Sequence, residues 1–118
     1  MPTDTTRPHV FDATTAGFEA DVLQKSLQVP VLVDFWAPWC GPCRMMAPAY
    51  GQAAAQLEPR IRVAKVYTEA AQALGGRYNI RSIPTLALFV GGREVARQPG
   101  AMTNPAQIVQ WVMAHLPR

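Results

Sequence analysis

The sequence predicts an α/β fold in which a central mixed sheet of about five strands is flanked by four helices. Apolar stretches with strand character alternate with helix-forming stretches, and the last third of the chain has the pattern of a hairpin followed by a helix. Apolar residues make up 49% of the 118 residues and charged residues 16%, which is typical of a globular chain and excludes a disordered one. We expect a flexible N-terminal extension at residues 1–9 and a single domain at residues 10–118.

The first half of the chain begins with a short predicted strand at residues 10–11. A helix follows, and its apolar stripe is expected to contain Phe18, Val22, Leu23 and Leu27. Residues 31–36 are almost continuously apolar, which indicates a strand covered on both faces. Gly41-Pro42 breaks this pattern, and a long helix then runs to about residue 58 with Pro48 inside it, where we expect a kink.

The second half of the chain supplies a strand at residues 61–67, a short helix at 69–78, and two strands at 85–90 and 94–98. Gly91-Gly92 predicts a tight hairpin turn between the last two strands, because both glycines tolerate positive φ. Asn104 is expected to cap the last helix, with Pro105 at its first position.

The net charge of +3 comes from basic residues that are scattered along the chain without a basic run. We therefore expect no nucleic-acid partner. No apolar run approaches the roughly 20 residues that a membrane span needs, and the first residues contain no signal-peptide core. The sequence thus predicts a cytoplasmic protein without membrane association, and a monomer is the simplest expectation.

The two cysteines, Cys40 and Cys43, follow an apolar strand and open a predicted helix, which is the context of a redox motif. A zinc site needs about four ligands, and His9 and His115 lie near opposite ends of the chain, so we expect no metal. A purely structural disulfide across so short a loop would constrain the unfolded chain little. The spacing therefore favours thiol–disulfide chemistry.

In a cysteine pair that follows a strand and opens a helix, we expect Cys40 to point outward at the helix N-terminus. Backbone N–H groups and the helix dipole there stabilise a thiolate. The thiolate is the attacking species in disulfide exchange, and Cys43, facing inward, would resolve the mixed disulfide. Asp34 is an acid inside an apolar strand, where a charge is costly. From the residues alone it is either a structural, hydrogen-bonded carboxylate or an acid held for proton transfer.

The segment 34–44, together with Ile83-Pro84-Thr85 and Gly100-Ala101, resembles the thioredoxin family over nearly everything from Phe18 to the C-terminus. The resemblance implies the thioredoxin fold. The stretch 68–85 is also similar to the bacterial subgroup that usually carries an N-terminal zinc ribbon. That ribbon needs four cysteines and this sequence contains two, so the subgroup stays open.

The resemblance implies a role for several residues around the cysteines. Asp34 matches the buried aspartate that exchanges a proton with the second cysteine through water, and Lys65 matches the lysine beside it. An edge-facing, solvated lysine is the alternative for Lys65. Pro84 matches a cis-proline that packs against the disulfide, and the backbone of Ile83 would bind an extended substrate segment as in strand addition.

The implied substrate-binding surface around Cys40 consists of Trp39, Gly41, Pro42, Ile83, Pro84, Gly100 and Ala101. Such an apolar patch persists because partners dock on it. We expect Trp36 to lie in the core. Tyr67 departs from the Asn or Asp of many relatives and is expected to touch no catalytic group.

By resemblance the chain is a protein-disulfide reductase that binds no cofactor itself. Its partners would be disulfide-containing protein substrates and a thioredoxin reductase, to which NADPH and FAD belong. Two alternatives stay open. One is an oxidase or isomerase of the same fold in an oxidising compartment, although Gly41-Pro42 resembles the reductases. The other is a non-catalytic binding module on the same scaffold.

Overall fold

The computed structural model describes residues 9–117 of the chain. Its five-stranded sheet has the order β1-β3-β2-β4-β5. The strands are β1 (Val10–Asp12), β2 (Val31–Trp36), β3 (Arg62–Tyr67), β4 (Thr85–Val90) and β5 (Arg93–Pro99). Strand β3 pairs in parallel with β1 and β2, whereas β4 pairs antiparallel with β2 and β5. The predicted mixed sheet is confirmed, with β2 at its centre. Residues 1–8 of the predicted extension lie outside the described residues.

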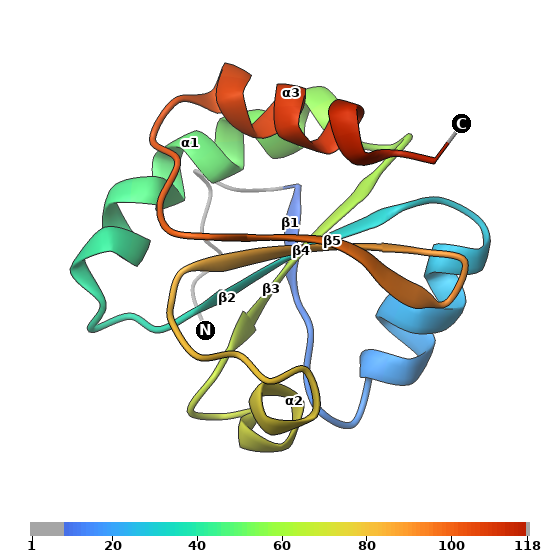
Figure 1. The fold of residues 1–118 in the computed structure, drawn as a ribbon, viewed down its shortest axis with the longest axis horizontal. Helices are drawn as coiled ribbons and strands as arrows, with labels where there is room; N and C mark the ends of the chain where they lie inside the picture. The colour runs from blue at the N-terminus through green and yellow to red at the C-terminus, as the bar shows by residue number, and fades with distance from the viewer. Residues whose placement is uncertain (1–8, 118) are drawn as a thin grey trace.

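Four helical segments cover the sheet. They are η1 (Glu19–Gln24) continuing into η2 (Lys25–Leu27), α1 (Gly41–Leu57), α2 (Gln72–Arg77) and α3 (Pro105–His115). Helices α1 and α3 lie on one face of the sheet, while the η1–η2 segment and α2 lie on the other (Figure 1). In the described part of the chain, no helix is long and apolar enough to cross a membrane.

The central strand β2 contributes to a packed layer on each face of the sheet. Leu32 belongs to the cluster built with α1 and α3, whereas Val31, Val33 and Phe35 belong to the cluster on the opposite face. All four side chains are fully buried, which explains the nearly continuous apolar run. Because side chains alternate along a strand, Asp34 lies on the face of Leu32, under α1.

Local signals place the turns and helix starts where the sequence predicts them. Gly91 and Gly92 have φ of 66° and 88° in the β4–β5 turn, as a tight hairpin requires. The Asn104 side chain accepts a hydrogen bond from the Ala106 N–H at 2.9 Å and so caps α3. The Ile83–Pro84 peptide bond is cis, as the resemblance implies, and a second cis bond, at Glu58–Pro59, is not foreseen from the sequence.

Two expected elements differ in detail from the structure. The short helix α2 begins at Gln72 instead of residue 69, because Ala71, with φ of −131° and ψ of 53°, lies outside the helical region and separates α2 from the turn at Tyr67. Leu27 is 68% exposed and does not join the buried stripe. It lies in the tighter turn η2, which has three residues per turn and rotates the side chain away from the stripe.

Candidate active site

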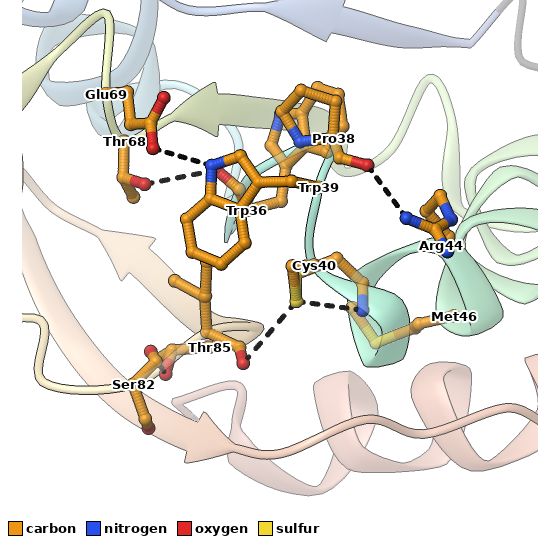
Figure 2. The surroundings of a disulfide bond; sticks show 12 residues. Trp36, Pro38, Trp39, Cys40, Arg44, Met46, Thr68, Glu69, Ser82 and Thr85 are labelled. Carbon is orange, nitrogen blue, oxygen red and sulfur yellow. Dashed lines mark hydrogen bonds between the residues drawn. A yellow bond between two sulfur atoms is a disulfide. The ribbon is translucent and has the colours of Figure 1, made fainter.

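The two cysteines lie at the point where the chain leaves the central strand and enters the longest helix. Cys40 is the N-cap residue of α1, and its sulfur accepts a hydrogen bond from the Cys43 N–H at 3.2 Å (Figure 2). The cysteines form a disulfide, with their Cα atoms 5.2 Å apart. Helix α1 has 17 residues, so the sulfur of Cys40 lies at the positive end of a long helix dipole. This position favours a thiolate at Cys40 when the bond is reduced.

Both cysteines are buried in this oxidised structure. Cys40 is 5% exposed and Cys43 is 2% exposed, so the expected outward-pointing Cys40 is wrong for the disulfide form. The physical reason is that the two cysteines form one buried cluster with Ala37, against which Trp36, Tyr67 and Ile83 pack. We call Ala37, Cys40 and Cys43, with these three neighbours, the cysteine cluster.

Asp34 lies on the α1 face of the sheet and is 4% exposed. It lines a cavity of about 230 Å³ together with Trp36, Pro38, Cys43, Arg44 and Ala47. Asp34 and Cys43 therefore line the same pocket, which is partly open to solvent, whereas Cys40 does not line it. A pocket of this size, with the carboxylate of Asp34 and the sulfur of Cys43 in its lining, has room for ordered water between the two groups.

Lys65 lies next to Asp34 across the sheet, as the resemblance implies. The two residues are register partners on β3 and β2, and Asp12 on β1 is the register partner of Lys65 on the other side. The Lys65 side chain is 12% exposed; its Nζ lies 3.9 Å from Asp12 Oδ1 and 4.7 Å from the centre of the Trp36 ring. Strand β3 is interior to the sheet, so the alternative of an edge-facing, solvated lysine is wrong.

The segment around Pro84 borders the disulfide from the other side. The carbonyl oxygen of Ile83 lies 3.8 Å from the sulfur of Cys40 (Figure 2). Gly100, with φ of 94°, donates its N–H to the Pro84 carbonyl at 2.9 Å and so fixes this segment from the end of β5. The structure thus brings together residues that lie about 40 to 60 positions apart in the sequence.

The residues of the expected substrate-binding surface differ in exposure. Trp39 is 61% exposed, and Pro42, Gly100 and Ala101 are exposed as well. Gly41 and Ile83 are partly buried, and Pro84 is buried. The outer surface around Cys40 is therefore formed mainly by Trp39, Pro42, Gly100 and Ala101, with Ile83 and Pro84 beneath.

Two aromatic residues lie elsewhere than the sequence predicts. Trp36 is partly buried and belongs to the cysteine cluster, because it is the last residue of β2 and emerges at the sheet end that carries the disulfide. Tyr67, the last residue of β3, packs in the same cluster with its ring 5.9 Å from that of Trp36. Tyr67 thus lies closer to the cysteines than a residue at a remote strand end would, although the partners of its ring and hydroxyl are Trp36 and Glu69 and not a cysteine.

The sequence analysis also missed Glu69. Its carboxylate accepts a hydrogen bond from Trp39 Nε1 at 2.6 Å and another from the Tyr67 hydroxyl at 2.9 Å (Figure 2 shows the first). The hydrogen bond to Glu69 is the main reason why the pKa of Tyr67 lies above its ordinary value. No local pattern marks an exposed glutamate in a loop as the partner of a tryptophan 30 residues away.

Comparison with known proteins identifies the family. The thioredoxin family model matches residues 9–114 of this chain. The chain belongs to the thioredoxin family. It is 51% identical to thioredoxin 1 of Nostoc sp. over 89 residues, which cover 75% of this chain and 81% of that protein. It is 38% identical to thioredoxin of Pseudomonas aeruginosa over 108 residues, covering 92% of this chain and 97% of that one. Thioredoxin of Haemophilus influenzae is 36% identical over 107 residues, with 91% and 97% covered.

Family membership and geometry together define the chemistry of the site. A thioredoxin with its redox pair at the start of α1 is a thiol–disulfide oxidoreductase that reduces protein disulfides. Within residues 9–117 no group of three or more His, Cys, Asp or Glu side chains is arranged to hold a metal ion. The pair Cys40 and Cys43 at the start of α1 is the reactive group of this thioredoxin.

Proposed function

We propose that this thioredoxin reduces disulfides in protein substrates, with Cys40 as the nucleophile and Cys43 as the resolving cysteine. One observation carries the assignment of roles: Cys40 is the helix N-cap whose sulfur accepts the Cys43 N–H, while Cys43 lines the cavity beside Asp34. A hydrogen bond to sulfur and the helix dipole stabilise negative charge at Cys40. The nearby carboxylate of Asp34 can accept the Cys43 proton in the second step of the reaction.

In the first step the Cys40 thiolate attacks one sulfur of the substrate disulfide. The substrate S–S bond breaks, a mixed disulfide forms between Cys40 and the substrate, and the second substrate sulfur leaves as a thiolate that takes up a proton. The N–H of Cys43 stays directed at the Cys40 sulfur and stabilises the charge before attack.

In the second step Cys43 transfers its proton to Asp34 through the shared cavity and attacks the sulfur of Cys40. The mixed disulfide breaks, the Cys40–Cys43 disulfide forms, and the first substrate sulfur leaves as a thiolate. The substrate has gained two electrons and the protein has lost two. Lys65, the register partner of Asp34, supplies positive charge that supports the ionised carboxylate.

The apolar surface around Cys40 supports docking of an extended substrate segment. Trp39, Pro42, Gly100 and Ala101 offer contact area without charge, and the partly buried Ile83 offers backbone groups beside Cys40. Backbone hydrogen bonds of this kind depend little on the side chains of the bound segment. We therefore expect several unrelated protein substrates.

The protein must be reduced again after each turnover. We propose a thioredoxin reductase as the donor, with NADPH and FAD bound to that partner and no cofactor bound to this chain. A reductase resupplied in this way works where thiols are kept reduced, so we place it in the cytoplasm. Residues 10–118 would act as one domain and as a monomer, with residues 1–9 as an extension.

Reduction of insulin disulfides by NADPH, in the presence of a bacterial thioredoxin reductase, tests the proposal. The wild-type protein should sustain turnover, and replacing Cys40 by Ser should abolish it. If the wild-type protein leaves insulin oxidised, the catalytic role is wrong and a binding module on this scaffold becomes the better account. A reduction potential near that of DsbA, about −120 mV, would instead indicate an oxidase.

A further inference from the structure

The most exposed aromatic side chain beside the disulfide is held by a single carboxylate. Trp39 directly precedes Cys40 and is 61% exposed, yet its Nε1 donates to Glu69 Oε2 at 2.6 Å. Figure 2 shows the Trp39 indole between Glu69 and Cys40. An exposed indole can rotate about two side-chain torsions. The hydrogen bond to Glu69 holds it in one orientation only if the Glu69 carboxylate is itself fixed.

Glu69 is an exposed residue of the loop between β3 and α2, so its own position needs a support. Its second carboxylate oxygen, Oε1, accepts a hydrogen bond from the Tyr67 hydroxyl at 2.9 Å. The two oxygens of Glu69 are thus used by two aromatic donors that come from different segments of the chain. A carboxylate held by two donors keeps one orientation, whereas an exposed carboxylate with one donor rotates among several.

Tyr67 is the rigid end of this chain of contacts. It ends β3, is the register partner of Trp36 on β2, and packs its ring in the cysteine cluster. The Tyr67 ring is therefore fixed by the sheet, while its hydroxyl reaches outward to Glu69. The raised pKa of Tyr67, caused mainly by its hydrogen bond to Glu69, agrees with this contact.

We propose that Tyr67 is a positioning residue that acts through Glu69 to hold the Trp39 indole in place as a docking surface for protein substrates. The inference rests on the proposed function, because it concerns how that site selects its substrates. A folded protein segment covers Trp39 when its disulfide reaches Cys40, whereas a small disulfide reaches the sulfur without that contact. Tyr67 therefore favours protein disulfides over small ones.

Tyr67→Phe removes the hydroxyl and keeps the ring in the cysteine cluster. We expect the KM for insulin to rise about two- to tenfold, the range that the net contribution of one ordinary hydrogen bond gives. The kcat/KM for free cystine should change much less. Tyr78→Phe is the matched control, because Tyr78 packs against Phe18 and Phe89 on the other face of the sheet.

The indole N–H resonances in a proton–nitrogen NMR spectrum report on Trp39 directly, and Trp39→Phe assigns its peak. Tyr67→Phe should shift the Trp39 peak upfield and speed its exchange with water, and Tyr78→Phe should leave it unchanged. Glu69→Ala should shift it further. Since Tyr67 acts through Glu69, adding Tyr67→Phe to Glu69→Ala should have no further effect on the peak or on the insulin KM.

An unchanged Trp39 peak in Tyr67→Phe would overturn the proposal. So would a rise of the insulin KM on Tyr67→Phe that is as large in the Glu69→Ala background as in the wild-type background. Glu69→Ala alters only an exposed loop residue, so it still tests the hold on Trp39 if Tyr67→Phe weakens the fold: an unchanged Trp39 peak in Glu69→Ala would overturn the proposal as well. Failure of the wild-type protein to reduce insulin would refute the proposed function instead, and the NMR comparison would still decide whether Tyr67 positions Trp39.

Discussion

Gly100 offers a test in which backbone conformation alone decides the outcome. It lies at the end of β5 with φ of 94°, a region that favours glycine, and its N–H donates to the Pro84 carbonyl at 2.9 Å. A Cβ atom added to Gly100 would meet no atom within 4 Å. Replacing Gly100 by Ala therefore introduces backbone strain without a steric clash.

The size of the effect follows from two opposing contributions. Forcing a residue with a side chain into positive φ costs about 1–3 kcal/mol. The alanine also lowers the conformational entropy of the unfolded chain, which stabilises the folded protein by about 0.4–1 kcal/mol. We expect Gly100→Ala to lower the free energy of unfolding by about 1–2 kcal/mol. If the chain relaxes instead by turning φ negative, it loses the hydrogen bond to Pro84 and moves Ile83 away from Cys40.

Urea denaturation followed by circular dichroism measures the loss, with Gly75→Ala as the control. A Cβ at Gly75 likewise meets no atom within 4 Å, but Gly75 lies inside α2. Gly75→Ala should therefore stabilise the protein by about 0.5–1 kcal/mol. The KM for insulin should rise in Gly100→Ala and stay constant in Gly75→Ala. A Gly100→Ala protein as stable as the wild type would refute the reasoning.

Three further predictions concern the roles of single side chains. Cys43→Ser should accumulate a mixed disulfide between Cys40 and insulin, visible by mass spectrometry under non-reducing conditions, whereas Cys40→Ser should trap none; a trapped Cys40→Ser adduct would reverse the two roles. Asp34→Asn should slow release of substrate from the mixed disulfide about a hundredfold, yet leave the attack of Cys40 unchanged when measured in a Cys43→Ser background. Tyr50→Phe removes the hydroxyl that donates to the buried Ala64 carbonyl at 2.6 Å and should cost about 1–2 kcal/mol in urea denaturation, a larger loss than in Tyr78→Phe.

Features that depend on neighbouring residues could be predicted from the sequence. The spacing of Cys40 and Cys43 after an apolar strand locates the redox pair, because a helix start brings residues three apart into contact. Gly91-Gly92 and Asn104 specify a turn and a cap through their own backbone and side-chain chemistry. The central position of β2 follows from its apolar residues alone.

Features that depend on distant residues could not be predicted in this way. The contact of Trp39 with Glu69 is decided by the conformation of the β3–α2 loop, and the turn at Tyr67 sets that conformation. The pairing of Lys65 with Asp34 is expected only through the family resemblance, and the place of Asp12 beside Lys65 depends on a strand register that the residues alone do not give. The burial of Cys40 likewise depends on Ile83, which borders it from the segment before β4.

The central claim is that Cys40 and Cys43 carry electrons from NADPH, through a thioredoxin reductase, to protein disulfides. Oxidation of NADPH coupled to the reduction of insulin tests it most directly. The account predicts sustained turnover that requires this protein and stops in both Cys40→Ser and Cys43→Ser. No turnover with the wild-type protein, or turnover that survives the loss of Cys40, would contradict it.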